Sequence, residues 1–260
     1  MKTLAIIGGG NLGKSILNGL VNSENSIFDK IFITRRNIDL IKDLESNTVT
    51  VTSDNILAAR EADVIILAIK PFKIEGVLDE IRAVLSKNKI IISVVTGTGI
   101  STIKKYSDAK VYRAMPNTAI AIKQSITMIA GGYDDESNKI VKDIFDQVGE
   151  TVEIEEEMMG AATVFGASGI AFALRYLRAA TQGGIEIGFS SKTSQFIAAQ
   201  TVKGACELIL QNGTHPEEEI DKVTTPRGVT ISGLNEMEHQ GFSSALVKGL
   251  LTSYEKVMKM

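Results

Sequence analysis

One polar turn near the end of the chain groups residue types that suit a small anionic ligand. Residues 221–234 contain three threonines, Pro226 and Gly228 between two helical patterns, and no charged residue lies between Arg227 and Asn235. Hydroxyl groups and the free backbone N–H groups at the start of a helix favour an anion. Ordinary turn chemistry between two helices would explain the same composition. The turn is therefore a candidate binding site that needs support from elsewhere in the chain.

The start of the chain supplies that support. A glycine triplet, Gly8-x-Gly10-x-x-Gly13, follows an apolar run at 4–7 and precedes an amphipathic helix that begins at Asn11. In this setting the first glycine permits a tight turn, the second lets the backbone approach a pyrophosphate, and the third lets the helix pack on the sheet. The helix N-terminus also favours phosphate. The pattern predicts dinucleotide binding.

The end of the second predicted strand indicates which dinucleotide is bound. An enzyme that prefers NAD places an acidic residue there for the ribose 2′-hydroxyl. This chain has Thr34, Arg35 and Arg36 instead, and guanidinium groups suit a 2′-phosphate. A solvated surface pair is the alternative interpretation of these arginines. We expect NADP(H) as the cofactor, with NAD(H) bound at lower affinity, and no metal.

Together the two ends resemble the pyrroline-5-carboxylate reductase family, the enzymes that complete proline synthesis. The C-terminal signature matches residue by residue at Asp221, Val223, Thr224, Pro226, Gly228, Thr230, Gly233 and Leu234. The resemblance covers nearly the whole chain. It implies an NADPH-dependent reduction of L-1-pyrroline-5-carboxylate to L-proline, by hydride transfer to the cyclic imine.

The resemblance also implies roles for individual residues. Thr230 is the expected catalytic residue, because it matches the family hydroxyl closest to the ring nitrogen. The expected substrate-binding residues are Glu156, Ser168, Lys222, Val229 and Thr230. The expected cofactor-binding residues are Gly8, Gly10, Asn11, Leu12, Gly13, Thr34, Arg35, Arg36, Asn55, Ala68, Ile69, Lys70, Pro71, Val94, Val95 and Thr96. Asn55 also suits the N-cap of a helix, and Glu156 suits an acidic helix start.

Three positions depart from the family pattern. Ala119 stands where a proline is usual, which should alter only a turn. Ile170 stands where the active-site segment has a proline, so the local kink expected there is in doubt. Arg227 replaces a common second glycine, and it would add a cation near the substrate carboxylate if its side chain points inward.

The residues of these motifs are predicted to lie on alternating strands and helices. Short β-branched runs occur at 4–7, 30–33, 48–51, 64–69, 90–94, 111–113, 125–129 and 151–154, and helical patterns occur at 11–22, 38–45, 54–61, 73–86, 100–105 and 135–148. This alternation predicts an α/β fold, with an N-terminal Rossmann-type doubly wound sheet. The run at 125–129 should pair antiparallel, because too few residues precede it for a helical crossover.

After residue 153 only helical patterns remain, at roughly 156–187, 191–211, 217–224, 231–239 and 242–258. We therefore expect a Rossmann domain at 1–153 and an all-α domain at 154–260 for substrate binding and dimerisation. The first of these helices is rich in alanine and glycine and should be buried nearly all round. Phe165, Phe172 and Tyr176 are expected to be core residues. The apolar faces of these helices exceed what the helical domain can cover within one chain. They therefore predict a homodimer or higher homo-oligomer.

Composition limits the class of protein. The net charge of −3 argues against a general nucleic-acid binder, and no apolar run long enough for a membrane span or a signal-peptide core is evident. A single cysteine, Cys206, fits a reducing compartment. We expect a cytoplasmic enzyme whose partners are a small-molecule substrate and further copies of the chain, with neither nucleic acid nor membrane.

Three other functions stay open at this point. A hydroxyacid or 6-phosphogluconate-type dehydrogenase would need a lysine four residues before an asparagine in the helical domain, and the chain has that spacing only at Lys14 and Asn18. A non-catalytic NADP-binding regulator is the second alternative, since Ile170 and Arg227 depart from the family pattern. A related imine reductase is a third. The two histidines, His215 and His239, lie outside the motifs and are expected to be structural or solvated.

Overall fold

The structure is a computed structural model that describes residues 2–23 and 27–259. Its contacts divide the chain into two compact units, one formed by Met1–Ser168 with Tyr254–Met260 and one formed by Gly169–Ser253. Residues just after the predicted domain division at 153 pack with the first unit, because Met159 and Ala162 bury their side chains against Met128. The division into domains at 1–153 and 154–260 stays a prediction.

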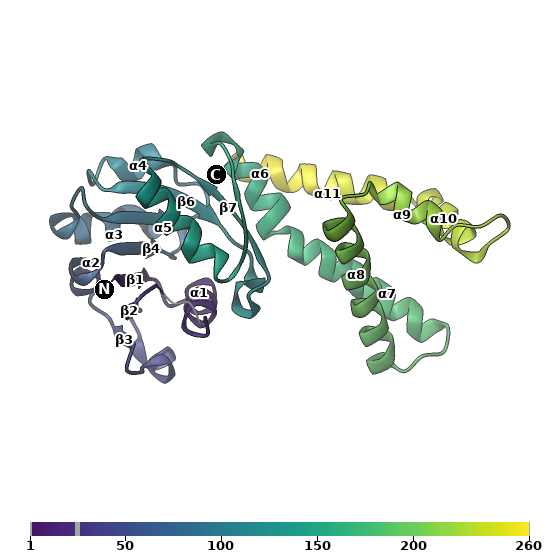
Figure 1. Ribbon diagram of the computed structural model, residues 1–260, viewed down its shortest axis with the longest axis horizontal. Helices are drawn as coiled ribbons and strands as arrows, with labels where there is room; N and C mark the ends of the chain where they lie inside the picture. The colour runs from purple at the N-terminus through teal and green to yellow at the C-terminus, as the bar shows by residue number, and fades with distance from the viewer. Residues whose placement is uncertain (1, 24–26, 260) are drawn as a thin grey trace. The chain divides into compact units, whose positions relative to one another are not determined.

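The first unit is built on one eight-stranded sheet (Figure 1), and each predicted strand is present. The strands are β1 (Thr3–Ile7), β2 (Lys30–Thr34), β3 (Val49–Thr52), β4 (Val64–Leu67), β5 (Ile90–Ser93), β6 (Lys110–Met115), β7 (Ser125–Ala130) and β8 (Gly149–Glu153). Their order is β3-β2-β1-β4-β5-β6-β7-β8. Among the described strands the one antiparallel pair is β6 with β7, as predicted from the short connection between them, and β8 pairs parallel with β7. The fold is the expected doubly wound sheet.

Successive side chains of each strand point to opposite faces of the sheet, and a separate hydrophobic core lies on each face. Leu4 and Ile6 of β1 belong to one core, and Ala5 and Ile7 belong to the other. Helices α1 (Asn11–Val21) and α5 (Asp135–Asp146) cover the first face. The second face is covered by α2 (Asn55–Glu61), α3 (Ile74–Ile81) and α4 (Ile100–Lys104). Burial on both faces explains the continuous apolar runs in the sequence.

Two predicted helices of the first unit differ in the structure. The segment at 38–45 forms two short 3₁₀ turns, Ile38–Leu40 and Lys42–Leu44, instead of one helix. Only Ile41 between them is buried, and Asn37 accepts a hydrogen bond from the Asp39 N–H at 3.1 Å, which favours a local turn. The predicted helix at 73–86 shortens to α3 followed by a 3₁₀ turn, Arg82–Val84.

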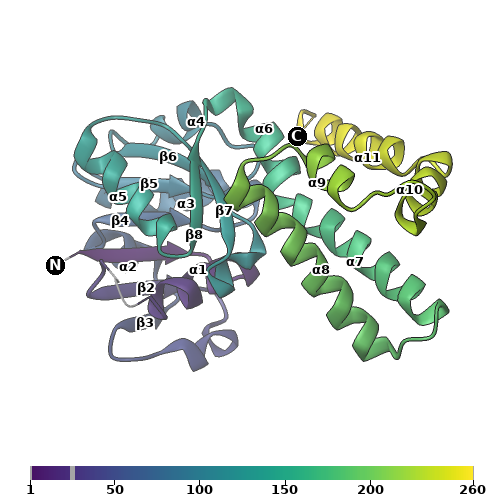
Figure 2. The same cartoon turned by 45° about the vertical axis from the view of Figure 1, so that its right-hand side comes forward.

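The helical half begins with a 3₁₀ turn, Glu156–Met158, and α6 (Met159–Ala162), which is followed by a π-helical turn at Thr163–Ala167. The second unit then contains α7 (Gly169–Glu186), α8 (Ser191–Asn212), α9 (Pro216–Lys222), α10 (Val229–His239) and most of α11 (Phe242–Val257). Figure 2 shows α7 and α8 as neighbours joined by a short turn. They approach closely at Gly184, where a Cβ atom would lie 2.0 Å from the Ser194 hydroxyl oxygen.

The expected burial of this helical segment is wrong for the single chain. None of the α7 residues, all of which the structure describes, is buried. Phe165 is 77% exposed and Tyr176 is 41% exposed, so neither belongs to a core within one copy. Apolar side chains of α8 and α11 are exposed as well, among them Phe196 and Leu251. Helices with this composition need a partner surface that the chain itself does not provide.

Candidate functional site

The glycine turn after β1 has the geometry of a phosphate-binding loop. Gly8 has φ +118°, and a Cβ atom there would lie 2.2 Å from the Ala68 carbonyl oxygen. At Gly13 a Cβ atom would lie 2.0 Å from the Gly8 carbonyl oxygen, so α1 packs directly against the turn. A Cβ atom at Gly10 would meet no described atom within 4 Å. Two glycines therefore serve backbone packing, and the third leaves an open approach to the N-terminus of α1.

A cavity of about 390 Å³ opens at this turn, at the carboxyl edge of the sheet. Nine of the predicted cofactor residues line it, namely Gly8, Gly10, Thr34, Arg35, Arg36, Asn55, Ala68, Ile69 and Lys70. Asn11, Leu12 and Gly13 form the first turn of α1 beside it, and Pro71 begins the 3₁₀ turn Pro71–Lys73. Leu67 pairs with Ser93 in the sheet, so Val94, Val95 and Thr96 continue along the same edge. The structure thus gathers the predicted cofactor residues at one edge.

The two predicted arginines have different surroundings. The Arg35 side chain donates a hydrogen bond from Nη1 to the Gly9 carbonyl oxygen at 2.6 Å, and the Gly9 N–H donates to the Thr34 carbonyl oxygen at 2.6 Å. Arg35 therefore ties the end of β2 to the glycine turn. Arg36 is exposed and also lines the cavity. Of the two, Arg36 is the better placed to meet a phosphate without giving up a structural bond.

Asn55 is not the helix cap that the sequence indicated. The N-cap of α2 is Asp54, whose carboxylate accepts a hydrogen bond from the Leu57 N–H at 2.8 Å. The Asn55 side chain instead accepts from the Thr34 hydroxyl at 2.6 Å and donates to the Glu80 carboxylate at 3.0 Å. Because Asp54 fills the cap position, the Asn55 side chain is free to make these two bonds in the cavity wall.

Sequence reasoning missed two charged residues of this cavity, Lys73 and Glu80. Both come from the segment after β4, and Glu80 is near the end of α3. The only signal in the sequence is that a helix follows a strand that ends at the ligand-binding edge. Nothing in the spacing of Glu80 relates it to Asn55, which is 25 positions earlier in the chain.

Glu156, a predicted substrate-binding residue, makes its contacts within the first unit. Its Oε1 atom accepts a hydrogen bond from the Ile100 N–H at 2.7 Å and lies 3.4 Å from Nη1 of Arg113. Arg113 is 9% exposed, and its Nε atom has no hydrogen-bond partner among the described residues. These groups line a cavity of about 270 Å³ that also includes Gly97 and Gly99. The carboxylate is therefore held by the loop that follows β5.

Ser168, the other predicted substrate residue of this segment, ends the π-helical turn. Its N–H donates to the Thr163 carbonyl oxygen at 2.9 Å, the wide spacing typical of a π-turn. The helix is thus irregular just before Ile170, where the family pattern has a proline. Gly166 lies inside the turn, and a Cβ atom there would lie 2.1 Å from the terminal methyl of Met128, which would have to move. The irregularity does not depend on proline.

The remaining predicted substrate residues lie in the second unit. Val229 and Thr230 are the first two residues of α10, so their N–H groups have no partner within the helix. Val229 is 91% exposed and Thr230 is half-buried. The Lys222 amine donates to the Glu219 carboxylate at 2.7 Å, and this bond helps to lower the pKa of Glu219. The roles of all these residues stay predictions.

Arg227 has a backbone conformation that explains the family preference for glycine at this place. Its φ is +58°, in the left-handed region, and its side chain is exposed. The turn is closed by the Gly228 N–H, which donates to the Thr225 carbonyl oxygen at 2.9 Å. The chain keeps the turn geometry while it replaces glycine with a residue for which that geometry is unfavourable.

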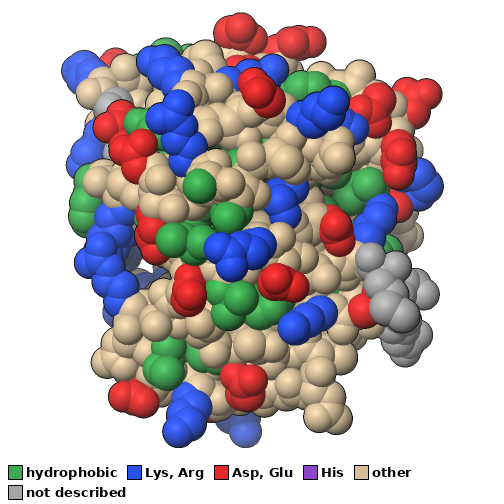
Figure 3. Space-filling view, turned by 90° about the vertical axis from the view of Figure 1, so that its left-hand side faces the viewer, with side chains coloured by type: hydrophobic (Ala, Val, Ile, Leu, Met, Phe, Trp, Pro, Cys, Tyr) green, Lys and Arg blue, Asp and Glu red, His purple; other side chains and the backbone are tan. Residues whose placement is uncertain are grey.

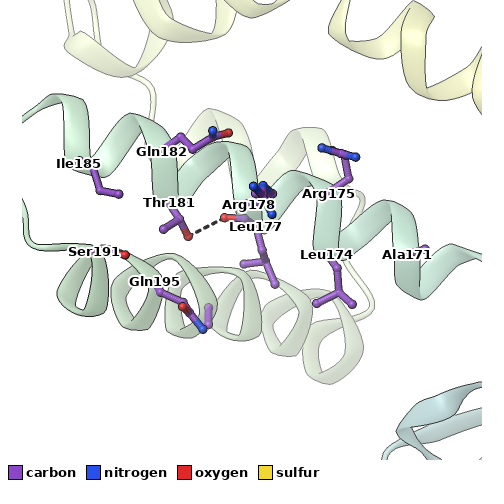
Figure 4. A pocket seen from close by; sticks show the side chains of 11 residues that line it. Ala171, Leu174, Arg175, Leu177, Arg178, Thr181, Gln182, Ile185, Ser191 and Gln195 are labelled. Carbon is purple, nitrogen blue, oxygen red and sulfur yellow. Dashed lines mark hydrogen bonds between the residues drawn. The ribbon is translucent and has the colours of Figure 1, made fainter.

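A third cavity, of about 750 Å³, lies between α7 and α8 in the second unit. Figure 4 shows Leu174 and Leu177 on its wall, while Arg175 projects from α7 away from α8. The Thr181 hydroxyl donates back to the Leu177 carbonyl oxygen at 2.8 Å, so its proton is not free for a ligand. The cavity is an open groove between two helices that expose apolar side chains.

Comparisons with known proteins agree with this arrangement. Residues 156–260 match the family described as pyrroline-5-carboxylate reductase dimerisation, and residues 3–97 match the family described as NADP oxidoreductase coenzyme F420-dependent. The first match covers α7 to α11, which expose their apolar side chains in a single copy, and it indicates homo-oligomerisation.

Relatives extend the similarity along the chain. The chain is 42% identical to pyrroline-5-carboxylate reductase 1 of Dictyostelium discoideum, over 99% of this chain and 49% of that protein, so it spans about half the length of that relative. It is 41% identical to pyrroline-5-carboxylate reductase 2 of the same organism, over 99% of this chain and 93% of that protein. A crystal structure of Plasmodium falciparum pyrroline carboxylate reductase with NADP bound is 25% identical, has a TM-score of 0.89, and covers 98% of this chain and 97% of that chain. The chain belongs to the pyrroline-5-carboxylate reductase family.

Proposed function

We propose that this protein is a pyrroline-5-carboxylate reductase, an oxidoreductase acting on a CH–NH bond, that uses NADPH to reduce L-1-pyrroline-5-carboxylate to L-proline. The observation that carries the proposal is the cavity at the glycine turn, with Arg35 and Arg36 in its wall, in a chain that belongs to this family. The glycine backbone and the free N–H groups of α1 suit a pyrophosphate, and the arginines suit a 2′-phosphate.

The cofactor supplies the hydride, and the chain supplies orientation and hydrogen bonds. The N–H groups of Val229 and Thr230 are proposed to hold the substrate carboxylate at the start of α10. The Thr230 hydroxyl is proposed to bond the ring nitrogen while the neighbouring carbon accepts the hydride. If the substrate binds as the iminium, its nitrogen already carries the proton and no strong general acid is required.

Two alternatives are less well supported. A hydroxyacid-type dehydrogenase lacks the required lysine and asparagine spacing in the helical half, and the family relation points to an imine substrate. A non-catalytic regulator rested on the departures at Ile170 and Arg227. The helix is irregular just before Ile170, at the π-helical turn Thr163–Ala167, and Arg227 adopts a left-handed conformation, so these departures no longer favour it.

The proposed partners are the small-molecule substrate and a second copy of the chain. The match to a dimerisation family over 156–260 supports a homodimer or a higher homo-oligomer. One helical run of the described residues, Glu156–Glu186, has the length and composition of a membrane span. Only 22% of its apolar 18-residue stretch is buried. A second copy would cover the same side chains, so we propose that this segment packs between subunits.

Two further features bear on partners and location. On the face shown in Figure 3, lysine and arginine side chains are interspersed with aspartate and glutamate, with no extended basic patch of the kind that nucleic acids require. Cys206 is a free, exposed thiol. It suits a reducing compartment, and we propose a cytoplasmic location.

The experiment that tests the function is a direct assay of the purified protein with NADPH and pyrroline-5-carboxylate. We expect the absorbance of the reduced nicotinamide to fall and proline to accumulate in equal amount. Protein that binds NADPH in a calorimeter but forms no proline would favour the regulator instead. Consumption of NADPH with a hydroxyacid or keto acid, and none with the imine, would favour the dehydrogenase.

A further inference from the structure

Glu80 brings a negative charge into the wall of the cofactor cavity. It is the one acidic residue among the described residues that line this cavity, and four cationic side chains line it as well. These are Arg35, Arg36, Lys70 and Lys73. A carboxylate beside an anionic ligand weakens the binding of that ligand by charge repulsion, so its presence affects which ligand binds best.

Two short hydrogen bonds connect this carboxylate to the end of β2. Glu80 accepts from the Asn55 amide at 3.0 Å, and the oxygen of the same amide accepts from the Thr34 hydroxyl at 2.6 Å. Both ends of the Asn55 side chain are therefore in use, and its orientation is set by Glu80. The carboxylate lies one side chain away from Thr34, at the strand end where the ribose 2′ substituent of a bound dinucleotide is recognised.

No salt bridge within 4.0 Å joins Glu80 to a cation among the described residues. The Arg35 guanidinium bonds the Gly9 carbonyl oxygen. The Lys70 and Lys73 amines lie 6.0 and 5.8 Å from the centre of the Phe72 ring, a side chain that is 79% exposed. The charge of Glu80 therefore acts on whatever occupies the space beside Thr34 and Asn55.

A carboxylate at this place has opposite effects on the two nicotinamide dinucleotides. It repels a 2′-phosphate, whereas it favours the dephosphorylated ribose, by its field and by fixing Asn55 as a partner for a 2′-hydroxyl. We propose that Glu80 is a specificity-determining residue that weakens the preference for NADP(H) set by the arginines and so retains binding of NAD(H). This inference rests on the proposed binding of a dinucleotide in this cavity.

The test is calorimetric titration of the Glu80→Gln variant with NADP⁺ and with NAD⁺, in parallel with the parent protein. Glutamine keeps an acceptor for the Asn55 amide and removes only the charge. We expect the dissociation constant for NADP⁺ to fall by about two- to fivefold, the range for a solvent-exposed charge pair. The constant for NAD⁺ should stay equal or rise. High salt should shrink the difference between variant and parent, because mobile ions screen the repulsion.

The matched control is Asp79→Asn, which removes the same charge from the preceding residue of α3. Asp79 is not among the residues that line the cavity. Burial raises the pKa of the Tyr106 phenol, and the charges of Glu75 and Asp79 raise it further. We expect this variant to bind both dinucleotides as the parent does. Equal gains in NADP⁺ affinity for Glu80→Gln and Asp79→Asn would overturn this inference and leave the proposed function standing. An unchanged ratio of the two dissociation constants in Glu80→Gln would do the same. A parent protein that binds neither dinucleotide would overturn the proposed function with it.

Discussion

Glu156 and Ile100 are joined by a hydrogen bond of 2.7 Å, from the backbone N–H at the start of α4 to the carboxylate at the start of the helical half. The same carboxylate oxygen is 3.4 Å from the buried guanidinium of Arg113. One side chain thus links the loop after β5, the strand β6 and the turn that leads into α6. That loop carries Val94, Val95 and Thr96, three of the predicted cofactor residues, so Glu156 is placed to hold them.

Replacing Glu156 by glutamine should therefore reduce stability and not substrate binding alone. The change leaves Arg113 without a charged partner, which should cost about 1–3 kcal/mol of unfolding free energy. Urea unfolding measures this cost. Glu157→Gln changes the next, exposed residue and should stay within about 0.5 kcal/mol of the parent. Unaltered stability with a raised KM for the imine would instead favour a direct substrate contact.

The two arginines at the end of β2 should separate into different roles. Arg36→Ala is expected to raise the KM for NADPH about tenfold and to leave the KM for NADH nearly unchanged, because it removes a contact to the 2′-phosphate only. Arg35→Ala should impair both cofactors, since Arg35 supports the glycine turn through the Gly9 carbonyl. Steady-state kinetics with each cofactor measures both effects. Identical cofactor profiles of the two variants would contradict this division.

Asp134 should make stability depend on pH in acid. It bonds the Lys110 amine at 2.6 Å and caps α5 by accepting from the Ser137 N–H at 2.9 Å, and these bonds lower its pKa from 3.8 to about 2. A lowered pKa stabilises the fold above the unfolded value, and this contribution is lost as the pH falls through about 2. Asp134→Asn should lower the Tm at pH 6, and the difference from the parent should vanish between pH 4 and pH 2. Thermal melts at several pH values measure it, and a constant difference would refute the ion pair.

Much of the fold follows from the sequence because its elements depend on local signals. Runs such as Val64–Leu67 are buried on both faces of a parallel sheet, so β-branched residues occur without alternation. The glycine turn is equally local, since Gly8 and Gly13 are needed for contacts with neighbouring backbone. Where local signals were ambiguous the prediction was wrong, as for the helix expected at 38–45, because a single buried side chain, Ile41, does not sustain a helix.

The parts of the site that the sequence did not predict depend on contacts between distant segments. The Asn55 and Glu80 side chains come from different helices, and the sequence pattern of neither helix predicts the hydrogen bond between them. Glu156 was predicted from a family match as a substrate contact, while its hydrogen-bond partner Ile100 is 56 positions away. Exposure of Phe165 was also missed, because an apolar helix has the same composition whether its partner is the same chain or a second copy.

Replacing Arg227 by glycine should change the stability of the fold very little. Its φ of +58° is unfavourable for a residue with a Cβ atom, so Arg227→Gly relieves strain of about 1 kcal/mol while it adds flexibility to the unfolded chain. The two effects nearly cancel, and we expect the unfolding free energy to change by less than about 1 kcal/mol. Lys203→Gly, in the middle of α8, has no such relief and should destabilise by about 1 kcal/mol. Equal losses in both variants would contradict the argument.

Thr230 is the residue on which the proposed chemistry depends most. Thr230→Val keeps the shape of the side chain and removes its hydroxyl, which we propose bonds the ring nitrogen as the carbon accepts the hydride. The loss should be about 1.5–3 kcal/mol, or roughly 10- to 100-fold in kcat/KM. Affinity for NADPH should not change, because the predicted cofactor residues lie in the other unit.

Two further variants make the Thr230 test specific. Thr230→Ser restores the hydroxyl and should recover most of the activity. Ser232→Ala removes a hydroxyl in the same turn of α10, one that bonds the Gly228 carbonyl oxygen at 3.4 Å, and should leave kcat/KM within about twofold of the parent. A Thr230→Val enzyme as active as the parent, or a Thr230→Ser enzyme as impaired as Thr230→Val, would show that the hydroxyl has no part in the reaction. In that case only the backbone N–H groups of Val229 and Thr230 would remain as the proposed anchor for the carboxylate.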